Sequence, residues 1–329
     1  MNKTERIKAA LRGESPDRPP YGFWTHRPDI DLDPDRLAEE TAAFCARLDL
    51  DFVKSMPNGF YCVEDWGCEL DFSEVALGGV AKVVRPAISA LGDWGTLAAL
   101  NPARGALGRE LRHLSQLVLR VGADVPVLAT VFSPLTIASK LSNGAHRTHL
   151  ASNPEAVMPG LEIITHATCE FVRAALGCGC AGIFFATQDA THQAFDEAAY
   201  RRYAEPYDRR VLQAARNAGG WFNVVHMHGD DVMFDLLKQY PVDALNWHIG
   251  ETPPSIGTYR NNGGNLPILG GLQRGHITSR NLLAIYRDVE QTIAQTQGHG
   301  IIIAPACVIR HPVDETVLQE ITAKIKGLA

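Results

Sequence analysis

The 329-residue sequence lacks the long apolar runs of membrane proteins, since no stretch approaches the roughly 20 apolar residues that cross a bilayer. Runs of lysine and arginine are also missing, and the net charge of −6 argues against nucleic-acid binding. The seven cysteines are an odd number without the spacing of a disulfide framework, which favours a reduced setting. The polar N-terminal stretch does not resemble a signal peptide. We therefore expect a cytoplasmic protein with a small-molecule substrate, binding neither membrane nor nucleic acid.

Nucleotide-binding motifs are absent as well. A doubly wound nucleotide-binding sheet would usually carry G-x-G-x-x-G or a P-loop after an early strand, and neither occurs here. No fixed-period repeat, low-complexity segment or linker divides the chain. Hydrophobic residues make up 46% and charged residues 21%, as in a globular protein with a sizeable core. The sequence therefore predicts one domain over residues 1–329.

Short apolar runs alternate with longer amphipathic runs along the chain. Most of the short runs are continuously apolar, as strands covered on both faces are. The predicted strands are Pro20–Trp24, Asp51–Ser55, Val125–Thr130, Ala181–Ala186, Trp221–His228, Ala244–His248, Pro267–Gly271 and Gly300–Ala304. The predicted helices are Asp35–Leu48, Gly108–Val121, Pro154–Leu176, Asp196–Asn217, Asp231–Gln239, Ser279–Gln295 and Asp314–Lys326.

This alternation predicts an α/β protein with a (β/α)8 TIM barrel. The insertion from Glu64 to Pro102 contains "ELDFSEVALGGVAKVVRP", whose glycine pair between two alternating runs predicts a small β-hairpin after the second strand. In such barrels the active site lies at the carboxyl ends of the strands. The residues at those ends are therefore the candidates for chemistry.

Polar side chains gather at the predicted carboxyl ends of the strands, whereas the opposite ends carry mostly Gly, Asp and Pro. This asymmetry is typical of an enzyme. We interpret Lys54, Gln188 and His248 as catalytic candidates. The candidates for substrate binding are His26, Arg27, Asn58, Tyr61, Ser133, Thr187, Asn246 and Gln273.

The stretch "WFNVVHMHGDD" places two histidines two residues apart at the end of a strand. Residues i and i+2 share one face of a strand, so His226 and His228 project together. Cys307 ends the eighth predicted strand at the same rim. Two imidazoles and a thiolate suit zinc, which keeps a fourth position open in catalytic sites. The sequence therefore predicts one zinc ion bound by these three residues.

Other interpretations of these residues stay open. A His-x-His pair can bind phosphate or carboxylate, or one imidazole can be hydrogen-bonded in the core, and a single cysteine is often a small buried hydrophobe. Lys54 suits a base of lowered pKa, an anion clamp or a solvated rim lysine. We interpret Cys178 and Cys180 as packing residues at the wrong end of the barrel. Glu64 and Asp65 are better explained as loop-fixing carboxylates than as an acid–base pair.

The order of motifs resembles the uroporphyrinogen decarboxylase superfamily over nearly the whole chain. The matching segments are "RIKAALRGESPDRPP", "VFSPLTIASKL", "CAGIFFATQ", "AYRRYAEPYDRRVLQAAR", "VVHMHG", "MFDLLKQYPVDALNWH", "LPILGGLQ" and "GIIIAPACVI". The resemblance implies a (β/α)8 barrel, in agreement with the alternation of strands and helices, and it favours a homodimer.

True uroporphyrinogen decarboxylases carry motifs that this chain lacks. Their R-Q-A-G-R-Y motif is replaced by "FWTHRPD", in which only Arg27 is a partial substitute. Their F-S-D-type segment, with its aspartate below the pyrrole nitrogens, is replaced by "FVKSMPNG", and "PAC" stands where they have G-H-G. A lysine would offer a donor where pyrrole N–H groups need an acceptor. These departures argue against uroporphyrinogen as the substrate.

The corrinoid-linked thiol methyltransferases of the superfamily are more similar at the metal motif. They bind zinc through H-x-C-G and a later cysteine, and this chain has H-M-H-G with His226, His228 and Cys307. The resemblance therefore implies a zinc-dependent methyltransferase that moves a methyl group from a corrinoid protein or small carrier to a thiol. Replacing a thiolate by an imidazole raises the charge of the site, which also favours zinc-water or carbonyl chemistry.

Two alternatives stay open. The chain could be a metal-free carboxy-lyase acting on a polycarboxylate or tetrapyrrole, with Arg27, Lys54, Arg274 and Arg310 as carboxylate clamps. It could also be a non-catalytic barrel that binds a corrinoid, a tetrapyrrole or a partner subunit.

Overall fold

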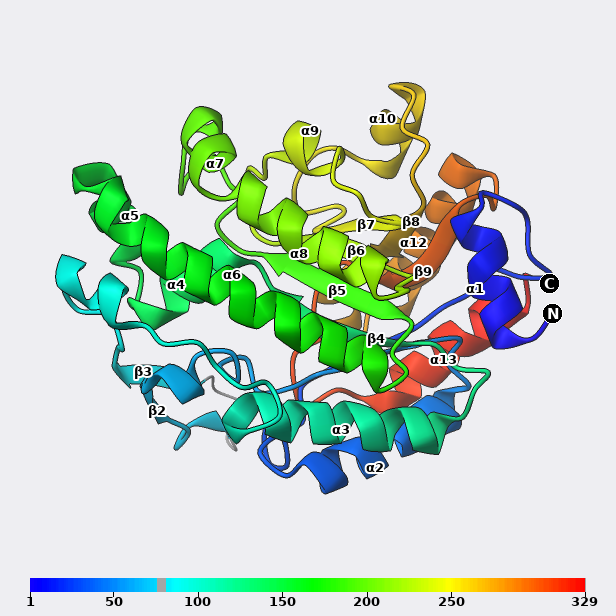
Figure 1. The fold of residues 1–329 in the computed structure, drawn as a ribbon. Helices are drawn as coiled ribbons and strands as arrows, with labels where there is room; N and C mark the ends of the chain where they lie inside the picture. Colours follow the sequence, from blue (N-terminus) through cyan, green and yellow to red (C-terminus); the bar gives the residue numbers. More distant parts are fainter. Residues whose placement is uncertain (76–80, 329) are drawn as a thin grey trace.

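A curled sheet of parallel strands, covered by helices, forms the centre of the computed structural model, which describes residues 1–75 and 81–328 (Figure 1). Neighbouring strands follow the order β1–β4–β5–β6–β7–β8–β9. Their bounds are Val53–Lys54 (β1), Val127–Phe132 (β4), Gly182–Thr187 (β5), Val224–Met227 (β6), Ala244–Trp247 (β7), Ile268–Leu272 (β8) and Ile301–Pro305 (β9). This α/β arrangement is consistent with a TIM-like barrel, and each of these strands overlaps a predicted one.

The helices lie on the outside of the sheet, and both chain termini lie at the same end of the molecule (Figure 1). The helices are α1 (Lys3–Leu11), α2 (Pro34–Leu48), α3 (Gly105–Val121), α4 (Pro134–Leu141), α5 (His146–Ser152), α6 (Pro154–Gly177), α7 (Glu197–Tyr203), α8 (Glu205–Asn217), α9 (Phe234–Leu237), α10 (Ile256–Asn261), α11 (Arg274–Thr278), α12 (Leu282–Thr296) and α13 (Glu315–Lys326). Short 3-10 helices cover Glu64–Trp66 and Leu91–Thr96. Among the described helices, none combines the length and the apolarity needed to span a bilayer.

The predicted helix Asp196–Asn217 is divided into α7 and α8. The break falls at Ala204, whose φ of −125° and ψ of −53° depart from the helical values. Pro206 stands in the first turn of α8, where its missing N–H costs no hydrogen bond. Pro206, which the sequence pattern predicted inside a single helix, therefore lies at the start of a separate helix, α8.

The predicted strand Pro20–Trp24 is not a regular strand. Its backbone still joins the two edges of the sheet, because Ile303 donates to the Pro20 carbonyl (2.8 Å) and Asp51 donates to the Tyr21 carbonyl (3.0 Å). The Tyr21 N–H, however, donates to the Asp51 carboxylate (2.9 Å), and Pro20 has no N–H to donate. The segment therefore lies between β9 and β1 without a continuous ladder of backbone hydrogen bonds.

The insertion after β1 contains an antiparallel pair of strands, β2 (Glu69–Asp71) and β3 (Lys82–Arg85). The glycine pair predicted to turn between them, Gly78 and Gly79, lies outside the described residues. Asp65 accepts hydrogen bonds from the backbone N–H groups of Ala106 and Leu107 at the start of α3. This carboxylate fixes the insertion to a helix end, as a loop-fixing role requires.

Two hydrophobic layers hold the sheet. Val224 packs with Phe52 and Leu128 in an inner cluster, whereas Val225 and Met227 pack in the larger layer between sheet and helices. This alternation follows from the strand period of two. His226 therefore belongs to the same face as Val224, which is the orientation that the His-x-His argument requires.

Asp51 connects the N-terminal segment to the sheet and yields a stability prediction. Its fully buried carboxylate pairs with Arg6 (2.7 Å) and Arg18 (2.6 Å). Removing one partner leaves buried charges uncompensated, so we expect Asp51→Ala to lower the free energy of unfolding by about 3–5 kcal/mol. Urea denaturation measures this. Asp49→Asn is the control: Asp49 also pairs with lysines but is half exposed, and asparagine tolerates its left-handed φ of 50°, so the change should cost less than about 1 kcal/mol.

Candidate metal centre

Four potential metal-binding side chains meet at the carboxyl ends of β6, β7 and β9. His226 lies within β6 and His228 follows it, while His248 follows β7 and Cys307 follows β9. One donor atom from each of these residues lies within 4.8 Å of every other. Strands far apart in the sequence therefore bring three imidazoles and one thiol together, because parallel strands end at one edge of the sheet.

The distances from the sulfur to the imidazoles fit a shared metal ion. Cys307 Sγ lies 3.7 Å from His226 Nε2 and 3.7 Å from His228 Nδ1. Tetrahedral zinc with bonds of about 2.3 Å to sulfur and about 2.0–2.1 Å to nitrogen would hold such atoms about 3.6 Å apart. The two distances therefore fit a shared zinc ion as well as a pair of hydrogen bonds to the sulfur.

His248 joins this cluster although we predicted it as a catalytic residue. Its ring centre lies 4.9 Å from that of His228, and its buried Nε2 has no hydrogen-bond partner among the described residues. Its Nδ1 faces Glu251 Oε2 at 3.6 Å. The signal was present in "NWH", where Asn246 and His248 stand two apart like the other histidine pair, on the neighbouring strand.

Asn246 orients His226. The two residues pair across β6 and β7, and the Asn246 side-chain oxygen contacts His226 Nδ1. Its amide donates to the carbonyls of Leu269 (2.6 Å) and Pro305 (3.4 Å), so its oxygen is left to accept. His226 Nδ1 therefore carries the hydrogen, and the lone pair of Nε2 points to the cluster.

Burial keeps the three imidazoles neutral. It lowers the pKa of His226 well below the ordinary 6.5, that of His228 to about 4, and that of His248 in the same direction. Burial also raises the pKa of the Cys307 thiol. Neutral imidazoles are the form that binds metal, whereas the thiol would release its proton on binding.

The cluster opens into a cavity of about 650 Å3 that contains several of the predicted site residues. His226, His228 and Cys307 form one part of its wall, and the predicted residues His26, Lys54, Asn58 and Gln188 form another. Arg274 and Arg310, the clamps of the carboxy-lyase alternative, also line it. Our predictions missed Asp31 and Lys140, which reach the cavity from a loop and a helix rather than from a strand end.

The remaining predicted residues have other partners and are not among the described residues that line this cavity. Arg27 pairs with Glu40 and Glu315, and Tyr61 donates to the Thr130 carbonyl. Ser133 caps α4, Thr187 donates to the His226 carbonyl, and Gln273 contacts Asp288. Their substrate-binding role therefore stays a prediction.

The fold agrees with the comparisons. The family model described as "Uroporphyrinogen decarboxylase (URO-D)" matches residues 2–327. The chain belongs to the uroporphyrinogen decarboxylase family. A methyltransferase from Methanosarcina mazei is similar over 99% of both chains, with 17% identity and a TM-score of 0.86. No curated protein matches this member of the family.

Two further solved structures share the fold more loosely. A putative vitamin-B12-independent methionine synthase from Listeria monocytogenes is 13% identical, covering 94% of this chain and 95% of that one, with a TM-score of 0.54. A B12-independent methionine synthase from Shewanella sp. W3-18-1, in complex with selenomethionine, is 10% identical. It covers 95% of this chain and 94% of that one, with a TM-score of 0.55. At these identities the likeness shows the fold alone.

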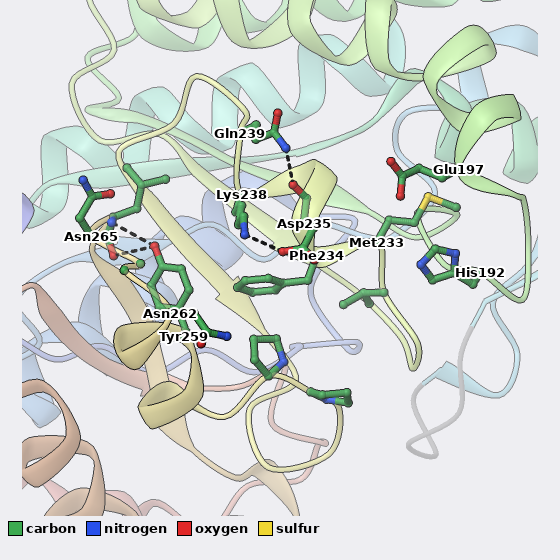
Figure 2. A pocket seen from close by; sticks show the side chains of 16 residues that line it. His192, Glu197, Met233, Phe234, Asp235, Lys238, Gln239, Tyr259, Asn262 and Asn265 are labelled. Carbon is green, nitrogen blue, oxygen red and sulfur yellow. Dashed lines mark hydrogen bonds and ion pairs between the residues drawn. The ribbon is translucent and has the colours of Figure 1, made fainter.

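A second cavity of about 470 Å3 lies beside α9 and α10 (Figure 2). Phe234 and Tyr259 contribute aromatic surface to it, and Lys238 pairs with Asp235 at its edge. The described residues that line it include none of the four in the metal cluster. The cavity next to the cluster is therefore the candidate active site of this URO-D family member.

Lys54 is buried in that cavity rather than solvated at its rim. Its ammonium donates to Thr130 Oγ1 (2.9 Å) and lies 4.7 Å from the centre of the Phe184 ring. Burial lowers its pKa from 10.5 to about 7. A lysine with this pKa can exchange a proton near neutral pH, as a catalytic group must.

The lowered pKa of Lys54 predicts a pH-dependent stability. Between pH 7 and 10.5 the unfolded chain keeps the lysine proton and the folded protein does not, so stability should rise with pH in this window. We expect Lys54→Met to be more stable than the wild type at pH 7 and below, with the difference shrinking towards pH 10. Urea denaturation of both proteins in the same metal state measures it. A difference independent of pH would contradict the lowered pKa.

Proposed function

We propose that this URO-D family protein is a zinc-dependent methyltransferase whose acceptor is a thiol. The single observation that carries the proposal is the convergence of His226, His228, His248 and Cys307, of which His226, His228 and Cys307 line the cavity. Bound zinc would hold a thiol as its thiolate, which is the nucleophilic form. We propose a methylated corrinoid protein or a small methyl carrier as the donor.

The protein's own residues would prepare the site. Asn246 holds the His226 tautomer, and buried neutral imidazoles accept the metal without first losing protons. Lys54 would take up the proton that the substrate thiol releases, because its pKa is about 7. Gln188, on the same cavity wall, would orient the substrate. The shared fold with the methyltransferase from Methanosarcina mazei supports the proposed methyl transfer.

The donor set affects the reaction. Two imidazoles and one thiolate, from His226, His228 and Cys307, would leave zinc with a net charge of about +1 and a fourth position open for the substrate, whereas one imidazole and two thiolates leave it near zero. A more positive site would hold a substrate thiolate more tightly and make it a weaker nucleophile. We therefore propose slower thiol alkylation than at a site with two cysteines. His228→Cys should raise the rate of alkylation.

Metal content tests the ligand assignment. We expect about one zinc ion per chain in the wild type and a small fraction of this in Cys307→Ala and His228→Ala, since each loses a donor atom. Asn246→Ala should keep the ligands but weaken zinc affinity by about 10–100-fold, through loss of the His226 hydrogen bond. Elemental analysis and chelator competition measure both.

Cys180→Ala is the matched control, because Cys180 is equally buried but lies before β5, at the opposite end of the strands. It should keep the zinc content of the wild type. Zinc that binds stoichiometrically in both Cys307→Ala and His228→Ala would refute the proposed centre.

The second candidate function is a metal-free decarboxylase. The basic side chains of Lys54, Arg274 and Arg310 around the cavity favour it, since they suit a substrate with several carboxylates. Exhaustive chelation separates the two: methyl transfer to a thiol should stop without zinc and return on its addition. Decarboxylation of a polycarboxylate that survives chelation would instead establish the second candidate. Spectral change with a corrinoid but no turnover would indicate a binding protein.

A further inference from the structure

A row of three side chains crosses neighbouring strands beside the metal cluster. Phe132 on β4 pairs with Ala186 on β5, and Ala186 pairs with His226 on β6. All three residues line the candidate active-site cavity. Residues that pair across parallel strands share one face of the sheet, and the strands lie about 4.8 Å apart. The row therefore begins at a member of the metal cluster and ends at an aromatic ring.

Ala186 leaves a gap in this row. It offers only a methyl group between the ring of Phe132 and the imidazole of His226, and the space in front of it is part of the cavity. His226 Nε2 lies 3.7 Å from Cys307 Sγ at the cluster. The gap is therefore next to the metal cluster, and a ligand group in it can be joined by a short alkyl chain to a sulfur at the cluster.

Aromatic rings form the floor of the cavity below Ala186. Phe184 precedes Ala186 by two residues and therefore shares its face of β5. The Phe184 ring stacks on the His226 imidazole, with ring centres 5.1 Å apart and planes inclined by 29°. Trp24 meets Phe184 edge-on at 5.6 Å. Both rings line the cavity, so its apolar surface is continuous from the metal cluster to Trp24.

The lysine beside this floor has its hydrogen bonds inside the protein. The Lys54 ammonium, which lies 4.7 Å from the centre of the Phe184 ring, donates to the Ser55 carbonyl (3.3 Å), Met56 Sδ (3.0 Å) and Thr130 Oγ1 (2.9 Å). These three acceptors match the three hydrogens of an ammonium group. A ligand group on the floor therefore meets aromatic surface rather than a free donor.

We propose that the acceptor thiol carries an aromatic group, which lies over Ala186 between Phe132 and the metal cluster and rests against Phe184. The inference rests on the proposed thiol methyltransferase function and narrows its substrate class to thiols with an aryl group. Cavities of about 300–1,000 Å3 bury most of a drug-sized ligand, so the volume of about 650 Å3 has room for a ring besides the thiol. Aromatic rings bury a large apolar area and favour edge-to-face or offset contacts with other rings.

Two matched thiols test this on the zinc-loaded full-length protein: 2-phenylethanethiol and ethanethiol, which is the same alkyl thiol without the ring. Calorimetry should show 2-phenylethanethiol binding at least about tenfold more tightly, because its ring moves from water to an apolar wall. Ala186→Leu fills the gap and should reduce this preference to less than about threefold. The zinc content and the affinity for ethanethiol should stay those of the wild type.

Ala198→Leu is the matched control, because it makes the same change at an exposed position of α7 and should keep the preference. Equal affinity of the wild type for the two thiols, or a preference that survives in Ala186→Leu, would overturn the inference. If Ala186→Leu does not fold, the smaller change Ala186→Val takes its place, and an unchanged preference there has the same meaning.

Omitting zinc separates this inference from the proposed function. Thiols that bind equally well with and without zinc would contradict the proposed function itself. Zinc-dependent binding of both thiols without a preference for the ring would leave the proposed function standing and overturn the inference alone.

Discussion

The parallel pairing of β6 with β7 is the constraint on which the candidate metal centre depends. It sets His226 beside Asn246, and the period of two then carries His228 and His248 to the same edge. A shift of one residue would turn the imidazoles into the layer between sheet and helices, where Val225 and Met227 pack. Both faces of the sheet are buried, so a shift would disrupt the packing of side chains in both hydrophobic layers.

The candidate active site combines low dielectric with unpaired charge. Burial keeps the imidazoles neutral, lowers the pKa of Lys54 and raises that of Asp31. Near neutral pH the shifts of Lys54 and Asp31 cost stability in the ligand-free protein, whereas those of the imidazoles do so only below the ordinary histidine pKa of 6.5. The two hydrophobic layers and ion pairs such as Asp51 with Arg6 and Arg18 stabilise the fold and offset this cost.

The strand pattern was predictable because a buried parallel strand is a short apolar run bounded by polar turns. The exception, Pro20–Trp24, fails because the Asp51 side chain takes the Tyr21 N–H that a ladder would use. His226, His228 and Cys307 were predicted together because strand ends converge in this fold. His248 was assigned to the same rim, but its membership of the metal cluster was missed, since a lone histidine at a strand end does not reveal how near its neighbour lies.

Local spacing alone determined the order of strands and helices, the pairing of His226 with His228 and the family resemblance, because these depend on residues a few positions apart. Only the tertiary structure decided which polar residues share the cavity. It turned Arg27 to Glu40 and Glu315, paired Thr187 with the His226 carbonyl and Gln273 with Asp288, and brought in Asp31 and Lys140. Loops and helix faces come together through packing between distant segments, and the spacing of residues along the chain carries no record of that packing.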